Sequence, residues 1–278
     1  MIMKNKMSFL AMIILAFGMT FMACEKDDDD DNGDNGNGVS GADTIASENR
    51  VAYFKFDGSI DDEEGHTTTG QNVAYTLDRF GNMDAAYKGD TNAHVMVDPV
   101  NDLKTGSITL SMWLRNQQFA GGTQFIVTLI DPSIEWNAGY GLWQEGSDRG
   151  DTLRYKLFTK HQNSDVFVWT DTQFGEASDV YFPPSKWFQF VYTYDGNSGE
   201  RAIYYNGDQV LRDTMMYNDA SMGPITVPAT ATNFYIGANP NEVQTWVGNY
   251  EGDLDDLRVF DVALTEEQVN NLYVAESE

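Results

Sequence analysis

The sequence has few residues that could form disulfides or metal sites based on sulfur and nitrogen. One of its 278 residues is cysteine, Cys24, which excludes an intramolecular disulfide and a zinc site built on several thiolates. Only three histidines are present, and no two of them have the spacing of metal ligands. Candidate chemistry therefore rests on carboxylates, amides and aromatic rings.

Positive charge is also scarce. The chain has 17 Lys and Arg against 43 Asp and Glu, a formal net charge of −26 at pH 7. A field of this sign repels phosphate backbones and anionic lipid head groups, so we expect no nucleic-acid partner. Hydrophobic residues make up 41% and aromatic residues 13% of the chain, which is enough for a hydrophobic core. Most of the chain is therefore expected to fold.

The first residues have the pattern of an export signal. Two lysines lie in residues 1–6, an apolar run covers residues 7–22, and Phe-Met-Ala precedes Cys24. The apolar run is shorter than the roughly 20 residues that span a bilayer, so we interpret residues 1–23 as a signal peptide. The Phe-Met-Ala-Cys sequence resembles the lipobox of bacterial lipoproteins, which implies that Cys24 is lipidated and becomes the first residue of the mature chain.

Residues 24–48 are expected to form an acidic, disordered tether. Residues 25–38 contain seven acids, one lysine and no apolar side chain, so nothing offsets the entropy lost on ordering. An acidic run after the lipidated cysteine resembles the signal that sends some Gram-negative lipoproteins to the outer face of the outer membrane; the alternative is a plain solvated spacer. We therefore expect an outer-membrane protein that faces the cell exterior, touches the membrane through its lipid anchor only, and has its folded domain in residues 49–278.

From residue 51 onward the pattern is typical of an all-β protein. Stretches rich in β-branched and aromatic residues are separated by Asn-Gly, Asp-Gly and Gly-Gly pairs. They predict strands over residues 51–56, 107–114, 125–130, 165–170, 187–194, 202–205 and 233–236. Helices are predicted over residues 99–103 and 265–273, and Thr265 with Gln268 has the sequence of a capping box. Many short strands with few helices predict a sandwich of antiparallel sheets.

Three segments together resemble the laminin-G-like members of the concanavalin A-like lectin and glucanase superfamily. They are Val-Ala-Tyr-Phe-Lys-Phe-Asp-Gly at 51–58, Trp-Phe-Gln-Phe-Val-Tyr-Thr-Tyr-Asp-Gly at 187–196 with Tyr-Tyr-Asn-Gly at 204–207, and Gly-Asp-Leu-Asp-Asp-Leu-Arg-Val-Phe-Asp at 252–261. The resemblance implies a two-sheet antiparallel jelly roll with one concave face and a short C-terminal helix. Because this fold hosts lectins, adhesion modules, hydrolases and spacers, the function has to be argued from sites.

Three alternating acids bear on whether the chain is a glycoside hydrolase. Glu251, Asp253 and Asp255 would share one face of a strand, and glucanases of this superfamily carry Glu-x-Asp-x-Glu on such a strand. Here the third acid is Asp, and a carboxyl displaced by roughly 1 Å can lose about a hundredfold in rate. We therefore expect no catalytic residues, while a glucanase-type glycoside hydrolase stays the alternative.

The same acids have a second use as calcium ligands, because calcium takes about six to eight oxygen ligands. The resemblance implies that the first and last strands are neighbours, which would bring Asp57 and Asp62 toward Asp255 or Asp256. One interpretation is a structural calcium ion held by these carboxylates. The other is that the acids cap turns and pair with Arg258.

Aromatic side chains bordered by carboxylates and amides could bind the flat faces of sugars. The candidates are Trp136, Tyr140, Trp143, Trp169 and Trp246. The alternative is that they pack in the core, as Trp usually does; Tyr140 and Trp143 also resemble the Gly-Tyr-x-Leu strand of the family. We predict a surface-anchored, non-catalytic module that binds glycan, with a protein-binding adhesion or structural lipoprotein as the alternative.

Overall fold

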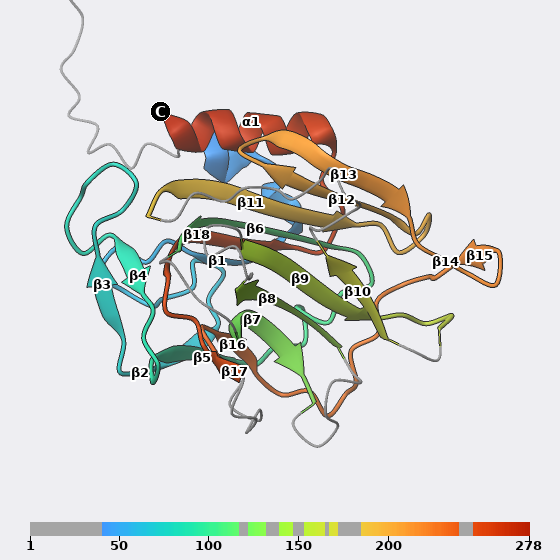
Figure 1. Ribbon diagram of the computed structural model, residues 1–278, viewed down its shortest axis with the longest axis horizontal. Helices are drawn as coiled ribbons and strands as arrows, with labels where there is room; N and C mark the ends of the chain where they lie inside the picture. The colour runs from blue at the N-terminus through green and yellow to red at the C-terminus, as the bar shows by residue number, and fades with distance from the viewer. Residues whose placement is uncertain are drawn as a thin grey trace, which may run out of the picture. The chain divides into compact units, whose positions relative to one another are not determined.

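The β-branched and aromatic stretches fold as strands of two large, mostly antiparallel sheets that stack on each other (Figure 1). The computed structural model describes residues 41–116, 122–131, 139–146, 153–164, 167–171, 185–238 and 247–278. All of them belong to one compact unit, Val39–Glu278. The predicted all-β, two-sheet sandwich with a C-terminal helix is confirmed.

Sheet A has the strand order β13-β12-β11-β6-β18-β4-β3, and β1 pairs with β18. Its strands are β1 (Arg50–Phe54), β3 (Ala74–Thr76), β4 (Ala86–Lys88), β6 (Ile108–Arg115), β11 (Trp187–Tyr194), β12 (Glu200–Tyr205), β13 (Asp208–Thr214) and β18 (Asp253–Phe260). Because β1 and β18 are antiparallel neighbours, the first and last strands lie side by side, as the resemblance implied.

Sheet B has the order β10-β9-β8-β7-β16-β5-β2, and β17 runs parallel to β7. Its strands are β2 (Thr67–Gln71), β5 (His94–Asp98), β7 (Thr123–Ile130), β8 (Gly139–Gly146), β9 (Leu153–Lys160), β10 (Phe167–Asp171), β16 (Phe234–Ile236) and β17 (Val247–Asn249). The hairpin of β14 (Met216–Tyr217) and β15 (Ala220–Ser221) forms a small third sheet.

The main hydrophobic core lies between the two sheets. Leu110 of sheet A and Leu142 of sheet B are fully buried in it. Successive side chains of a strand point to opposite faces. Phe234 and Ile236 therefore enter the core, and Tyr235 between them points to the outer face of sheet B.

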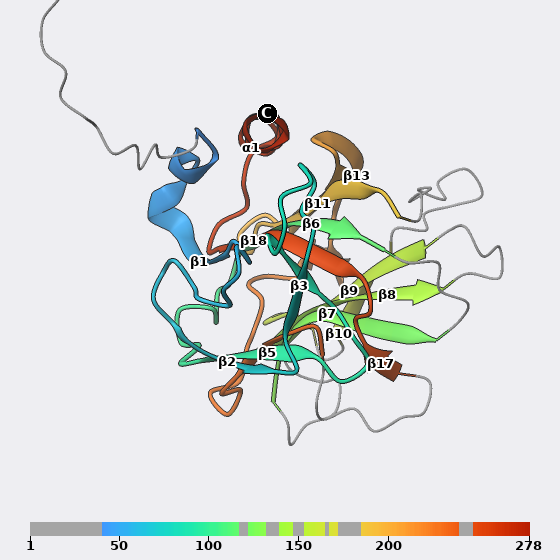
Figure 2. The same ribbon diagram turned by 90° about the vertical axis from the view of Figure 1, so that its left-hand side faces the viewer.

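Helix α1 (Glu266–Ser277) covers the outer face of sheet A (Figure 2). Its predicted capping box is present, because the Thr265 side chain accepts a hydrogen bond from the Gln268 N–H and the Gln268 side chain accepts one from the Thr265 N–H. Val269 and Leu272 are buried against this sheet in a second hydrophobic cluster. No helix in the part of the chain that the structure describes has the length and apolar character needed to cross a membrane.

The predicted end of the tether and one predicted helix are wrong. Residues 41–48, expected in the tether, contain the short helices η1 (Gly41–Thr44) and η2 (Ser47–Asn49), and the small apolar side chains Ala42 and Ala46 are buried in the cluster beneath α1. The helix predicted over residues 99–103 is a bend and turn instead, because five residues close too few α-helical hydrogen bonds to offset the cost of nucleation. Val100 and Leu103 hold this turn against the core.

Candidate functional site

The three alternating acids do not form an open acidic site. Asp253 and Asp255 flank core-facing Leu254 and therefore lie on the outer face of sheet A. Arg115 Nε lies 2.8 Å from an oxygen of Asp253. Glu251 precedes β18 and accepts a hydrogen bond from Gln124 Nε2 at 3.1 Å. Asp253 and Glu251 therefore each have a polar partner.

Asp255 and Asp256 share one guanidinium. Arg79 Nη1 lies 2.6 Å from an oxygen of Asp255, and Nη2 lies 2.7 Å from an oxygen of Asp256. Burial, followed by the charge of Asp256, raises the pKa of Asp255 to about 8. Burial also opposes ionisation of Asp256, but Arg258 and Arg79 outweigh it and lower the pKa of that carboxyl. Asp256 therefore carries the negative charge of the pair, and Arg79 occupies the space between them.

The other two predicted calcium ligands lie in the opening loop. Asp62 accepts a hydrogen bond from the Tyr53 N–H at 2.6 Å, and its second oxygen pairs with His66 Nδ1. Asp57 is exposed in a turn. No group of three or more His, Cys, Asp or Glu side chains that could hold a metal ion occurs among the described residues. The geometry matches the alternative in which the acids cap turns and pair with arginines, and calcium binding stays a prediction.

Tyr140 and Trp143 are core residues, so the expectation that they contact a ligand is wrong. Tyr140 is fully buried and donates a hydrogen bond to the Leu103 carbonyl at 3.2 Å. Trp143 is 2% exposed, with its ring centroid 5.2 Å from that of Phe125 and 5.3 Å from that of Phe158. A ring packed in this way has no free face for a sugar. The resemblance to the Gly-Tyr-x-Leu strand was the correct guide at these positions.

The remaining predicted site residues lie at or beyond the limits of the described chain. Trp136, Trp246 and Cys24 are outside the described residues. Trp169 lies in β10, where its backbone pairs with Phe158 of β9, but its side chain is outside the described part. The roles assigned to these four residues stay predictions.

A register-aligned row of residues crosses the outer face of sheet B. The row takes one residue from each strand of sheet B in the spatial order β2, β5, β16, β7, β8, β9 and β10. These residues are Thr69, Met96, Tyr235, Thr128, Gly141, Phe158 and Trp169. Residues paired across neighbouring strands share a face, so the outward direction of Tyr235 places the described side chains of the row on the outer face. A Cβ atom at Gly141 would lie 2.5 Å from Phe158 Cε1, so the Phe158 ring needs a glycine beneath it.

The partly exposed section of this face lies over β2, β5 and β16. We call it the sheet B platform: Thr69, Gln71, His94, Met96 and Tyr235. The rings of His94 and Tyr235 meet edge to face with centroids 6.0 Å apart, and Thr69 and Gln71 beside them are exposed. Burial lowers the pKa of His94 and raises that of Tyr235, so both side chains are neutral at pH 7. The platform therefore combines two rings, a hydroxyl and an amide without a formal charge.

Sequence reasoning missed this platform. The strand over residues 233–236 was predicted, and alternation within it would have placed Tyr235 opposite Phe234 and Ile236. Its ring contact with His94 depends on the pairing of β16 with β5, which that segment does not encode.

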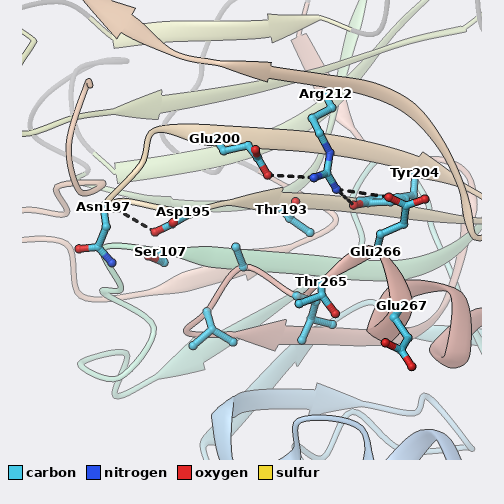
Figure 3. A pocket seen from close by; sticks show the side chains of 13 residues that line it. Ser107, Thr193, Asp195, Asn197, Glu200, Tyr204, Arg212, Thr265, Glu266 and Glu267 are labelled. Carbon is cyan, nitrogen blue, oxygen red and sulfur yellow. Dashed lines mark hydrogen bonds and ion pairs between the residues drawn. The ribbon is translucent and has the colours of Figure 1, made fainter. Parts of the chain in front are cut away.

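A hollow of about 560 Å³ lies between the β12–β13 hairpin and the start of α1 (Figure 3). Arg212 reaches across it, with Nη1 3.1 Å from Glu200, Nη2 3.6 Å from Glu266 and a hydrogen bond of 3.1 Å to the Tyr204 hydroxyl. Tyr204 is buried, so its ring offers no stacking surface. This hollow is polar and internally paired, and it fits a sugar less well than the sheet B platform does.

Comparison with known proteins identifies the fold and the family. One solved structure that matches is domain 4 of AbnA, a GH43 extracellular arabinanase from Geobacillus stearothermophilus, in complex with arabinotriose; it is 18% identical with a TM-score of 0.56, over 81% of this chain and 98% of that one. The botulinum neurotoxin serotype D binding domain is 15% identical with a TM-score of 0.57, over 82% of this chain. The binding domain of botulinum neurotoxin DC in complex with rat synaptotagmin II is 15% identical with a TM-score of 0.55, over 84% of this chain. The chain covers only about half of each neurotoxin chain, 52%.

No curated protein matches the sequence significantly. At the level of families, residues 89–270 match Laminin_G_3, described as the concanavalin A-like lectin/glucanases superfamily. The match covers more than half of the chain and includes strands of both sheets. The chain therefore belongs to the Laminin_G_3 family of the concanavalin A-like lectin/glucanases superfamily.

Proposed function

We propose that this chain is a non-catalytic module that binds carbohydrate on the sheet B platform. The observation that carries the proposal is an uncharged platform of rings and hydrogen-bonding groups on the outer face of sheet B, whereas α1 covers the outer face of sheet A. Sugars present flat C–H faces that stack on aromatic rings and hydroxyls that pair with polar side chains. Tyr235 would supply the stacking face, and Thr69, Gln71 and His94 would supply hydrogen bonds.

Two neighbours in fold bear on the choice of ligand. Domain 4 of the arabinanase AbnA was solved with arabinotriose, and this chain covers nearly all of it, 98%. This supports an oligosaccharide as the first class to test. The neurotoxin binding domain solved with synaptotagmin II supports a protein partner as the second candidate.

The pairing of the acids supports the non-catalytic part of the proposal. Asp253 and Asp255 lie on sheet A, whereas the platform lies on sheet B, and arginines hold both carboxylates. A retaining hydrolase needs two opposed carboxyls about 5 to 5.5 Å apart on either side of a sugar. With Arg115 on Asp253 and Arg79 on Asp255, neither carboxyl is free to act on a substrate.

We also propose that Cys24 carries the lipid anchor and that the domain is held at the outer membrane, facing the cell exterior. The support is the sequence alone: an apolar run closed by Phe-Met-Ala-Cys, followed by seven acids in residues 25–38. In that position a binding module would capture extracellular ligand at the cell surface.

An oligosaccharide array followed by calorimetry on the best hit tests carbohydrate binding. Tyr235→Ala is expected to weaken binding by about tenfold or more, which corresponds to ~1.4 kcal/mol, while Tyr235→Phe keeps the ring and most of the affinity. Tyr75→Ala is the matched control, because Tyr75 is a partly exposed tyrosine on strand β3 of sheet A. An array with no hit at high micromolar protein, or hits that Tyr235→Ala leaves unchanged, would refute the proposal.

A further inference from the structure

Exposed apolar side chains gather in one loop of the domain. The connection between β3 and β4 contains Leu77, Phe80 and Met83, which are 45%, 52% and 78% exposed. Val274, 49% exposed, lies in the C-terminal half of α1. These four are among the six large hydrophobic side chains that are exposed in the described part of the chain. A concentration of this kind marks an interaction surface more often than scattered single residues do.

The loop over residues 77–84, which we call the apolar loop, is held in one conformation. Asp78 is buried, and its carboxylate accepts hydrogen bonds from the Phe80 N–H at 2.9 Å, the Asn82 N–H at 2.8 Å and the Asn82 side chain at 2.8 Å. The Asp78 N–H donates to the Asn82 carbonyl at 3.2 Å. The apolar side chains are thus presented by a closed turn, and little conformational entropy remains to be lost when they bind.

Arg79 fixes the apolar loop to the end of α1. Its Nε donates to the Glu276 carbonyl at 2.9 Å, and its guanidinium lies 4.8 Å from the centre of the Trp113 ring. The same guanidinium carries the ion pairs to Asp255 and Asp256. Figure 1 shows the loop beside the C-terminal end of α1. The one cation of the loop thus points into the domain. Its guanidinium lies 4.5 Å from the centre of the Phe80 ring, and the rest of the Phe80 side chain stays exposed with Leu77 and Met83.

The polypeptide enters the folded unit at this same end. Gly41, the first residue of η1, lies against Ala275 of α1, with 3.7 Å between an ideal Gly41 Cβ position and Ala275 Cβ. Asp43 lies 3.4 Å from the guanidinium of Arg258, which also pairs with Glu276. The entry point and the apolar loop therefore flank the last turns of α1.

Sixteen residues, 25–40, separate the entry point from Cys24. A chain of this length reaches at most about 55 Å when fully extended. A lipid on Cys24 would keep the apolar loop near the bilayer at an effective concentration on the order of millimolar. At that concentration a weak apolar contact is enough to orient the domain.

We propose that the apolar loop and Val274 form a membrane-contact surface that inserts among the head groups of a neutral, zwitterionic lipid surface. The proposal rests on the lipid anchor at Cys24 and is independent of carbohydrate binding. A neutral surface is the occupant that fits, because the net charge of −26 repels anionic lipid and the charge of the loop arginine is already paired with that of Asp256. Apolar side chains in such a contact lie about 5–10 Å deep, at the boundary of head groups and acyl chains. The domain would then touch the membrane with its own surface as well as through the lipid.

A cysteine scan of the full, acylated chain in phosphatidylcholine vesicles tests this inference. Acylation blocks Cys24, the single cysteine, so Met83→Cys introduces one site for an environment-sensitive fluorophore. Met216→Cys in β14 is the matched control, a methionine that is 51% exposed outside the apolar loop. We expect a blue-shifted emission at position 83 and quenching by nitroxide-labelled lipid that is roughly twofold or more stronger than at position 216. Phe80→Asp added to Met83→Cys should remove this excess, because a charge is expelled from the head-group boundary.

Each outcome decides the inference. Equal quenching at positions 83 and 216, or excess quenching that Phe80→Asp does not reduce, would overturn it. Reduced solvent access at position 83 without quenching by lipid would identify a second protein copy as the occupant and would also overturn it. Labelling of Cys24 itself, seen as two fluorophores per chain, would show that the lipid anchor is missing. The inference rests on that anchor and would then be overturned. None of these results bears on the oligosaccharide array, so the two proposals fail separately.

Discussion

Replacing Glu276 with alanine should be among the most destabilising single changes outside the main core. Glu276 is 3% exposed in the last turn of α1, and its carboxylate pairs with the guanidinium of Arg258. It also accepts hydrogen bonds from Trp113 Nε1 at 2.7 Å and from Gln189 Nε2 at 2.8 Å. One carboxylate therefore satisfies three buried donor groups on the outer face of sheet A.

The expected loss follows from the groups that would be left behind. Breaking a buried ion pair by removing one partner typically costs about 3–5 kcal/mol, since the other charge stays buried. Arg258 would keep weaker pairs with Asp256 at 3.5 Å and Asp43 at 3.4 Å, which favours the lower end of that range. We expect Glu276→Ala to lower the free energy of unfolding by about 3 kcal/mol.

Equilibrium unfolding in urea measures this loss, with Glu278→Ala as the control, because Glu278 is an exposed acid at the end of the same helix. The control should change stability by less than about 0.5 kcal/mol. Glu276→Leu combined with Arg258→Met should recover much of the loss, because apolar replacement of both partners removes the unpaired charge. A loss below about 1 kcal/mol for Glu276→Ala would refute the view that this carboxylate holds the end of α1.

Two further results are expected. Burial lowers the pKa of His161 to about 4. Between about pH 6.5 and pH 4 the unfolded chain therefore binds a proton that the folded chain does not. The free energy of unfolding should fall by up to about 3 kcal/mol as the pH drops through this window. Urea titrations at several pH values should show this slope in the wild type and a smaller one in His161→Gln; equal slopes would contradict the assignment. Arg79 already pairs with Asp255 and Asp256, so the alternative in which these acids pair with arginines predicts that a calcium chelator leaves the melting temperature unchanged. A fall on chelation would support the predicted calcium site.

Local patterns predicted a large part of the fold. The strand predicted over residues 187–194 coincides with β11, because its aromatic and β-branched residues favour a strand that is buried on both faces. The capping box at Thr265 fixed the start of α1 for an equally local reason. The pairing of the first and last strands came from the resemblance, since strand order depends on contacts between residues about two hundred positions apart.

The site was much less predictable. Trp143 and Tyr235 are both aromatic residues in strands, but Trp143 is buried by Phe125 and Phe158, whereas Tyr235 keeps a partly exposed face. No local pattern separates these two cases, because tertiary packing decides which outward-facing ring is covered. Arg79 gave no sequence signal either, since its role depends on carboxylates 176 or more positions away.

The two outer faces of the sandwich differ in how freely their side chains could change. On sheet A, Val191 and Phe260 lie buried beneath α1, so a substitution there disturbs packing and the ion pairs that hold the helix. On sheet B, the exposed Thr69 and Gln71 contribute little to the core and could be replaced at small cost in stability. A binding specificity that is tuned by substitution needs exposed side chains that can be replaced without loss of stability, such as those on sheet B. This argument from stability favours sheet B as the ligand-binding face, and it does not depend on which sugar or protein is bound.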